Sequence, residues 1–293
     1  MYHRVAALPQ DPYGLAVHPD RFAAHVEELS RRGGVVPLEE LATTRSGGQI
    51  AVTFDDGYAD NATVAAPLLA STGLPATWFI TTGRLGRRRF WWDRLADGLL
   101  GSHAPDSADV TVQGRDLWLD LRTTEARRTA LRFVHRLLRP LPPDVLDDAV
   151  DEVLRDLGSP SRNDEEDLTM TADQLRRLAD LPLQEVGAHT RTHLQLRDQD
   201  EDLQREEILG SVRDLSALLA RPVRTFAYPF GTDRAVGPLA PRLVAESGCA
   251  LACSTTPGPV VRRSDRYRLP RLNVQDWGGD EFAAHLDQLL EAR

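Results

Sequence analysis

The sequence has few cysteines and lacks any long apolar run. Its 293 residues include two cysteines, and no stretch approaches the ~18 consecutive apolar residues of a membrane-spanning helix. Residues Met1–Val5 lead directly into strand-like sequence, without the basic segment and apolar stretch of a secretory leader. The sequence therefore predicts a cytoplasmic protein that does not span a membrane.

The two cysteines do not form a plausible disulfide. Cys249 and Cys253 lie four residues apart in a segment that is typical of a strand. At ~3.3 Å per residue, their separation is about 13 Å, which is too far for a disulfide bond. We expect two buried free thiols, compatible with a reducing compartment.

An excess of positive charge is also absent. The formal net charge of −9 at pH 7 argues against nucleic acid, anionic lipid or another polyanion as a partner. The composition, 41% hydrophobic and 27% charged, is typical of soluble globular proteins. No internal repeat or low-complexity tract is present. The length suits one large α/β domain or two small ones, with an ample core.

Short apolar runs alternate with amphipathic segments, which is typical of a parallel α/β fold. The predicted strands are Tyr2–Leu8, Ile50–Phe54, Ala76–Thr81, Glu185–Ala188, Thr225–Tyr228, Ala250–Ser254 and Arg268–Val274. The predicted helices are Pro19–Arg32, Asn61–Thr72, Ala172–Leu181, Asp202–Ala220, Pro238–Ser247 and Asp280–Glu291. Prolines in the first turn and glycines after the last turn support several of these bounds.

One region, residues 83–167, interrupts the alternation. It contains an aromatic loop at Phe90–Trp92, a hairpin around Gln113–Asp116, and helices at Thr124–Leu138 and Pro143–Leu157. We interpret it as an insertion in a fold that spans residues 1–293. Its apolar content predicts no core of its own.

Polar residues gather where predicted strands end, which is where parallel barrels place their active sites. Asp55 and Asp56 follow Phe54, and His189 follows Ala188, with His193 four residues further on. Adjacent carboxylates at the end of a buried strand need partners, because unpaired charges are costly in a low dielectric. One carboxylate and two imidazoles suit a divalent metal ion, and the second carboxylate suits a base acting on water. The pattern predicts a metallohydrolase.

Each motif also has a simpler interpretation. Two aspartates before a glycine occur in turns and helix N-caps. His189 and His193 would then be one hydrogen-bonded core histidine and one surface histidine. The combination and order of the two motifs favour the metal site.

Three motifs together resemble the polysaccharide deacetylases, carbohydrate esterase family 4: Thr53–Gly57, His189–His193 and Phe226–Gly231. Tyr2–Val5 and Leu269–Leu272 resemble the branch that includes poly-N-acetylglucosamine deacetylases. The resemblance covers nearly all of the chain outside the insertion. It implies a distorted (β/α) barrel of about seven parallel strands, a divalent metal ion, and hydrolysis of an N- or O-acetyl group.

The resemblance also implies roles for individual residues. Asp56, His189 and His193 would hold the metal ion, most simply zinc, with nickel, cobalt, manganese and iron as alternatives. Asp55 would be the general base. The backbone N–H of Phe230 would donate to the oxyanion of the tetrahedral intermediate.

Two positions depart from the family pattern. The arginine that usually orients the base, two residues before the proline of the third motif, is replaced by Ala227. Arg271 is our candidate to replace it. The family's late catalytic histidine is also missing, because His285 lies in helical sequence that does not match the motif. We take His3, in the first predicted strand, as the candidate general acid.

Four further residues are candidates for substrate binding. Tyr228 and Pro229 belong to the third motif, and Trp277 and Trp92 are candidate sugar-stacking aromatics. For both tryptophans, packing in a core or loop is the competing interpretation.

The leading hypothesis is a metal-dependent deacetylase that hydrolyses the acetamide of an N-acetylated sugar. The substrate would be a glycan precursor or a glycosylated small molecule. One alternative is another amide or ureide C–N hydrolase, because allantoinase-like enzymes share the scaffold. The other is a catalytically silent, carbohydrate-binding relative.

Overall fold

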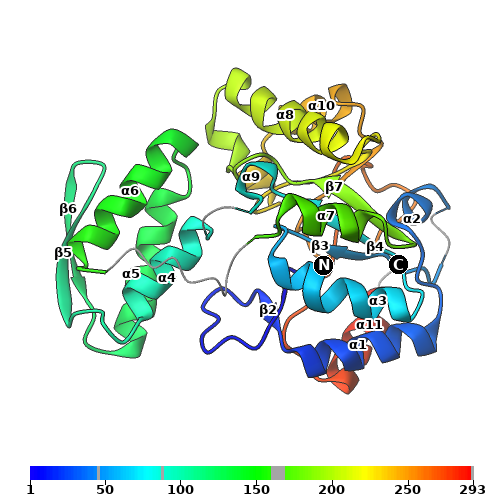
Figure 1. Ribbon diagram of the computed structural model, residues 1–293, viewed down its shortest axis with the longest axis horizontal. Coiled ribbons are helices and arrows are strands. Elements are labelled where there is room, and N and C mark those ends of the chain that lie inside the picture. Colours follow the sequence, from blue (N-terminus) through cyan, green and yellow to red (C-terminus); the bar gives the residue numbers. More distant parts are fainter. Residues whose placement is uncertain (45–46, 87–88, 160–168, 292–293) are drawn as a thin grey trace. The chain divides into compact units, whose positions relative to one another are not determined.

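A computed structural model describes residues 1–44, 47–86, 89–159 and 169–291. The chain divides into two compact units (Figure 1). The barrel unit consists of Met1–Gly86 and Thr169–Arg293, and the inserted unit consists of Arg87–Leu168. The predicted carboxyl-terminal end of the insertion falls in 160–168, outside the described residues.

The barrel unit is built on five parallel strands in the order β3-β4-β7-β8-β9. They are β3 (Val52–Phe54), β4 (Ala76–Ile80), β7 (Gln184–Ala188), β8 (Thr225–Ala227) and β9 (Leu251–Cys253). The sheet is curled into a half-barrel with helices around it, consistent with the distorted (β/α) barrel expected from the sequence. A separate parallel pair is formed by β1 (Arg4–Val5) and β2 (Ala16–Val17).

Two of the seven predicted strands do not join this sheet as strands. Tyr2 forms a single bridge beside Phe54, and Leu269 forms a single bridge beside Cys253. The N–H of Val274 donates to Met1 O at 2.9 Å, so the two edge segments meet. The strand predictions Tyr2–Leu8 and Arg268–Val274 were therefore too long, because each segment pairs only over one or two residues.

The predicted helices of the barrel unit are present, with bounds shifted by a few residues. They are α1 (Pro19–Arg32), α3 (Ala66–Ser71), α7 (Ala172–Ala179), α8 (Glu201–Leu219), α10 (Ala240–Glu246) and α11 (Gly279–Glu291). Two short helices were missed, α2 (Leu38–Thr44) and α9 (Asp233–Val236). The predicted helix at Asn61–Thr72 begins with a π-helical turn, Asn61–Ala65, before α3.

Local sequence explains the helix ends well. α1 begins with Pro19 in its first turn, Arg31 and Arg32 lie in its last turn, and Gly33 follows at φ 69°. Proline suits the first turn, cations suit the carboxyl end, and glycine adopts positive φ without strain. α7 begins with a capping box between Thr171 and Gln174.

Aromatic rings pack beneath the polar end of β3. Phe54 stacks on Trp78 with ring centroids 4.1 Å apart and on Tyr2 at 5.1 Å. All three side chains are at most 2% exposed. Burial of these large apolar surfaces fixes β3 against β4 and so fixes the residues that follow Phe54.

The inserted unit contains a helix, a hairpin and two further helices. These are α4 (Trp91–Leu100), β5 (Ser107–Val112), β6 (Arg115–Asp120), α5 (Thr124–Leu138) and α6 (Pro143–Asp156). The predicted hairpin and two helices are present, but the predicted aromatic loop is the start of α4. Gln113 and Gly114 have φ values of 51° and 71°, as a tight two-residue hairpin turn requires.

This unit has buried apolar residues of its own, which differs from the expectation of an insertion without a core. The fully or nearly fully buried side chains include Leu95, Leu99, Val110, Leu131, Val134, Val150 and Val153. They come from all three helices and the hairpin, whose elements pack on one another. The sequence estimate failed because each element contributes only one narrow apolar stripe.

Two sequence predictions concern the whole chain. Cys249 and Cys253 are buried free thiols, as predicted. Among the described residues, no helix is long and apolar enough to cross a membrane.

Candidate active site

The predicted site residues lie at the carboxyl ends of the parallel strands. Asp55 and Asp56 follow β3, His189 follows β7, and Phe230 lies in the turn after β8. Parallel strands present these ends at one edge of the sheet, so residues far apart in sequence converge there.

Asp56, His189 and His193 form a compact cluster. Asp56 Oδ1 lies 3.4 Å from His189 Nε2 and 3.3 Å from His193 Nε2. One potential ligand atom from each residue lies within 4.8 Å of the others. The three side chains are 2–8% exposed.

The protonation of His189 suits a bound cation in this cluster better than a hydrogen bond between His189 and Asp56. His189 Nδ1 lies 2.7 Å from Ala227 O, and a carbonyl only accepts, so Nδ1 carries the proton. In the neutral ring, the Nε2 lone pair then faces Asp56 Oδ1, a buried oxygen without a hydrogen-bond partner among the described residues. Two acceptors facing each other in a buried site are unfavourable unless a cation lies between them. The residues fit a divalent metal ion.

The electrostatics agree with this arrangement. Burial lowers the pKa of His193, which favours the neutral imidazole that a metal ion requires. Burial alone would raise the pKa of Asp56. The close contacts with His189 and His193, together with the charges of His193 and His3, outweigh burial and hold that pKa well below its usual range.

The backbone around the cluster is strained. Asp56, Thr190, His193 and Phe230 have φ values of 75°, 61°, 65° and 59°. Positive φ is uncommon for residues other than glycine and persists only where surrounding contacts impose it. These four account for most of the seven such residues in the described part of the chain.

A buried glutamate holds the loop between the two histidines. Glu207 of α8 is 3% exposed and accepts hydrogen bonds from the N–H groups of Arg191 and Thr192, both at 2.9 Å, and from Thr192 Oγ1 at 2.9 Å. On the other side, Gly83 N–H donates to Arg191 O at 2.7 Å. A Cβ on Gly83 would lie 2.7 Å from that oxygen, so only glycine permits this approach.

Sequence reasoning missed Glu207, although a signal was present. Glu207 lies on the buried face of α8 with Gln204, Ile208, Ser211 and Leu215. A carboxylate on a buried helix face needs donors, which predicts a contact with a neighbouring segment.

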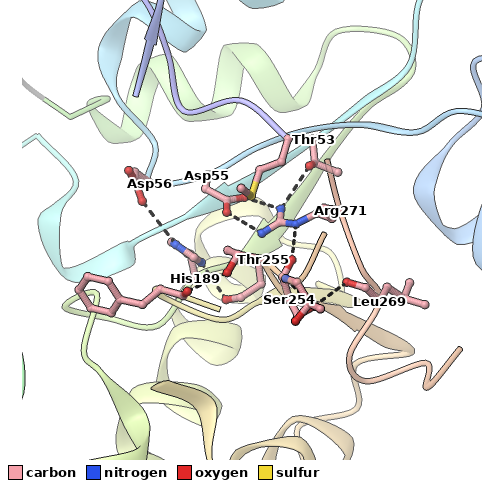
Figure 2. Close-up of polar contacts among 12 residues, drawn as sticks. Thr53, Asp55, Asp56, His189, Ser254, Thr255, Leu269 and Arg271 are labelled. Carbon is pink, nitrogen blue, oxygen red and sulfur yellow. Dashed lines mark hydrogen bonds and ion pairs between the residues drawn. The ribbon is translucent and has the colours of Figure 1, made fainter. Parts of the chain in front are cut away.

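Asp55 is clamped by Arg271 (Figure 2). The guanidinium donates Nη1 to Oδ1 and Nη2 to Oδ2, both at 2.7 Å, and its Nε donates to Ser254 O at 2.8 Å. Thr53 Oγ1 accepts a further bond from Nη1 at 3.2 Å. Both charged side chains are at most 7% exposed. Arg271 thus reaches the Asp55 carboxylate, as expected for a residue that replaces the missing arginine of the third motif.

The charge of Arg271 sets the state of Asp55. Burial would raise the pKa of this carboxyl, but the guanidinium and His189 outweigh burial and lower it. Asp55 is therefore ionised and fixed in orientation by two parallel hydrogen bonds.

His3 lies close enough to Asp55 and Asp56 for their charges to affect its pKa. Burial lowers the pKa of its ring, whereas the negative charges of Asp56 and Asp55 act in the opposite direction. Nδ1 is buried without a hydrogen-bond partner in the described part of the chain. Asn61 Nδ2 donates to His3 O at 2.8 Å and anchors the backbone of this residue.

The third motif contributes backbone geometry more than side chains. The Phe230 ring lies edge-on to His193 with centroids 4.8 Å apart, and Thr255 Oγ1 donates to Phe230 O at 2.8 Å. Tyr228 is fully buried and its hydroxyl donates to Tyr267 O at 2.9 Å. The Tyr228 phenol is thus used in the core, and Pro229 follows it in the turn. Substrate binding by these two residues stays a prediction.

The two candidate tryptophans make packing contacts. Trp277 stacks on His285 of α11 at 3.9 Å, and its carbonyl oxygen lies 2.9 Å from His25 Nε2 of α1. Trp92 is 4% exposed and stacks on Phe90 at 4.2 Å. These contacts favour the packing interpretation for both residues over a sugar platform.

Comparison with known proteins identifies the family. Residues 42–119 and 148–237, more than half of the chain, match the family model "Polysaccharide deacetylase". The chain belongs to the polysaccharide deacetylase family. A search of curated proteins gave no match.

Solved structures of deacetylases share the fold of this polysaccharide deacetylase family member. The Streptococcus pyogenes deacetylase PplD in complex with acetate is 16% identical, with a TM-score of 0.63 over 98% of this chain and 96% of that one. IcaB from Ammonifex degensii is 20% identical, with a TM-score of 0.62 over 99% and 94%. A de-N-acetylase from Aggregatibacter actinomycetemcomitans is 14% identical, with a TM-score of 0.59 over 97% of each chain.

The structure shows what surrounds the position at which this polysaccharide deacetylase family member has Ala227 in place of an arginine. Ala227 places no guanidinium near the base, and its carbonyl instead orients His189. The guanidinium that reaches Asp55 comes from Arg271, in the extended segment beside β9.

Proposed function

We propose that the protein is a metal-dependent deacetylase that hydrolyses the acetamide of an N-acetylated sugar. The observation that carries this proposal is the pairing of two neighbouring aspartates in different environments. Asp56 faces two imidazoles, and Asp55 is clamped by a guanidinium. A carbohydrate-binding protein would gain nothing from a buried, ionised carboxylate beside a metal cluster.

Asp56, His189 and His193 would hold the metal ion through one oxygen and two nitrogens. A divalent ion there would lower the pKa of a water molecule toward ~7 and polarise the acetyl carbonyl. Zinc is the simplest candidate for this donor set, and nickel, cobalt, manganese or iron also accept it.

Asp55 would take the proton from the attacking water, because its two oxygens are held in a fixed orientation by Arg271. Water adds to the acetyl carbon, and the carbonyl oxygen becomes an oxyanion. The N–H of Phe230 would donate to this oxyanion, a contact worth ~3 kcal/mol in comparable enzymes. The strained φ of Phe230 supports this role, since the turn sets the direction of its backbone.

Breaking the C–N bond requires a proton on the departing nitrogen. His3 would supply it, so that acetate and a free amine are released. Its buried Nδ1, which has no hydrogen-bond partner among the described residues, supports this role. The negative charges of Asp56 and Asp55 favour its protonated form and so oppose the lowering of its pKa by burial. An ester with a good leaving group needs no such proton. His3→Ala should therefore slow amide hydrolysis more than hydrolysis of an activated acetyl ester.

The test combines metal analysis with acetate release from a panel of N-acetylated sugars and glycosides. Wild-type protein should hold about one metal ion and release acetate. His189→Ala should lose both. Asp55→Asn should keep the ion and lose activity by ~10²-fold or more. Asp287→Asn, an exposed aspartate paired with Arg32, is the matched control and should change neither.

The panel also separates the alternatives. Release of ammonia or opening of cyclic ureides without acetate release would identify another C–N hydrolase. Sugar binding without any hydrolysis in metal-loaded protein would identify a silent relative. The cytoplasmic location expected from the sequence stays a prediction.

A further inference from the structure

The β5–β6 hairpin of the inserted unit can be followed in Figure 1. The burial of its side chains and its register give it two chemically distinct faces. Val110, Val112 and Leu119 are buried on the inner face, which packs against α5 and α6. Side chains of a strand alternate between faces, so every second residue points outward. The outer face consists of Ser107, Asp109, Thr111, Asp116, Trp118 and Asp120.

Trp118 is the exception to the polar outer face. Its side chain is 63% exposed, although the alternating pattern calls for a polar residue there. The other large hydrophobic side chains exposed in the described part of the chain are aliphatic: Val145, Leu183 and Val261. Single exposed aliphatic residues are ordinary. An indole on a rigid strand, surrounded by carboxylates and hydroxyls, instead breaks a local rule in the way that binding sites do.

The acidic groups beside Trp118 differ in their availability. Asp120 is paired with Arg122 at 2.8 Å, and Asp116 accepts a bond from Thr111 Oγ1 at 3.1 Å. Asp109 lies directly opposite Trp118 in the hairpin register and has no ion-pair partner within the described residues. Directly opposite residues have Cβ atoms about 5 Å apart, so one ligand can contact both side chains.

We propose that Trp118 and Asp109 form a binding surface for an amino-sugar chain that carries free amines. An indole face accepts the C–H face of a pyranose ring or an ammonium group, and a carboxylate pairs with the ammonium. The ligand class rests on the proposed function, because N-deacetylation converts a neutral acetamide into a basic amine that can take up a proton. The surface would therefore hold a polymer more firmly as its deacetylation proceeds.

Charge argues for this occupant over others. The outer face carries three aspartates, of which one, Asp120, is paired with Arg122. The remaining negative charge disfavours nucleic acid, anionic lipid and other polyanions. A partially deacetylated amino-sugar chain is polycationic and amphipathic, so it complements both Trp118 and Asp109.

The test titrates the full-length protein with an oligomer of glucosamine and monitors the indole N–H signal of Trp118 by NMR. The Trp118→Phe variant assigns that signal. We expect a saturable shift with the glucosamine oligomer and little response to a cellulose oligomer of equal length.

Trp118→Ala should weaken affinity about tenfold, and Trp118→Phe should retain part of it. Asp109→Asn should weaken binding and reduce its salt dependence. Leu183→Ala is the control for loss of an exposed apolar side chain and should change nothing.

Several results would overturn the proposal. An unmoved Trp118 signal would do so, and so would equal responses to the charged and neutral oligomers. If Trp118→Ala altered only the oligomeric state, the face would be a contact between copies of the chain. The glucosamine oligomer has no acetyl group, so its binding is independent of catalysis. A Trp118 response in a protein that releases no acetate would count against the proposed function alone.

Discussion

Asp55 and Arg271 form a buried ion pair whose two members depend on each other. Removing one partner of such a pair leaves an uncompensated buried charge and typically costs 3–5 kcal/mol. Arg271→Ala should therefore destabilise the protein by about this amount, measured by urea unfolding, and should slow acetate release by ~10²-fold or more. It should leave the metal bound, because Arg271 contacts none of the three proposed ligands.

Arg271→Lys separates charge from geometry. A lysine ammonium can compensate the charge of Asp55 but cannot form the two parallel hydrogen bonds. We expect stability to recover more than turnover does. Full turnover in this variant would show that the bidentate orientation of Asp55 is unnecessary.

The two thiols should be inert in the folded protein. Burial raises the pKa of both Cys249 and Cys253 to about 11, so the reactive thiolate is scarce near neutral pH. Labelling with a thiol reagent should be slow in native protein and complete after unfolding in urea. Rapid labelling of native protein would contradict their buried placement.

The same shift predicts a pH dependence of stability. The folded pKa of each thiol is raised above the unfolded value of about 9, so the unfolded chain releases the thiol proton at a lower pH than the folded protein does. The folded protein therefore loses stability as pH rises through this range. Between about pH 9 and 11, the free energy of unfolding should fall by ~1.4 kcal/mol per pH unit for each thiol. A variant with alanine at both positions should show a correspondingly shallower fall, measured by urea unfolding across this pH range.

At the scale of elements, α8 holds the loop between His189 and His193 through one carboxylate, that of Glu207. Glu207→Ala removes the acceptor for three donors of the loop between His189 and His193. Loss of such supporting contacts typically weakens metal binding 10–100-fold. We expect this loss in a competition titration against a chelator.

A neighbouring glutamate provides the control for Glu207. Glu206 pairs with the Arg191 side chain at the surface, where an ion pair contributes at most ~1 kcal/mol. Glu206→Ala should therefore leave metal affinity almost unchanged. Equal effects of the two substitutions would show that the Glu207 contacts do not position the loop.

Elements with a strong local signal were predictable from the sequence. The bounds of α1 and α5 match because caps and a clear apolar stripe mark them. The segments 2–8 and 268–274 were overestimated because their extended backbone pairs over single residues, which side-chain patterns do not reveal. α4 was missed because its consecutive aromatics obscure the helical period.

The site was predictable to the same degree. The convergence of Asp56, His189 and His193 follows from two motifs and from the rule that parallel strands converge at their carboxyl ends. Arg271 could be suggested but not placed, since its contact with Asp55 depends on how the chain returns beside β9. The contact of Glu207 is tertiary, and only its position on the buried face of α8 signalled it.

At the scale of the whole molecule, the chain leaves the barrel unit and returns to it at two points that lie close together. Gly86 N–H donates to Met170 O at 2.6 Å, and a Cβ on Gly86 would lie 3.5 Å from Thr171 Cα. The barrel unit is thus already closed across the point where the inserted unit leaves and returns. Insertions at such points are often dispensable for the fold of the surrounding domain.

Replacing residues 87–168 by a short glycine-serine linker should therefore leave a folded barrel unit. We expect it to bind metal with an affinity within about threefold of the full chain, because Asp56, His189 and His193 and their supporting contacts all lie in this unit. It should still release acetate from small N-acetylated sugars, whereas any preference for polymers that depends on Trp118 should be lost. Cooperative urea unfolding and metal content would measure the first outcome. If the deletion variant failed to fold with every linker length tried, the barrel unit would need the inserted unit for its stability.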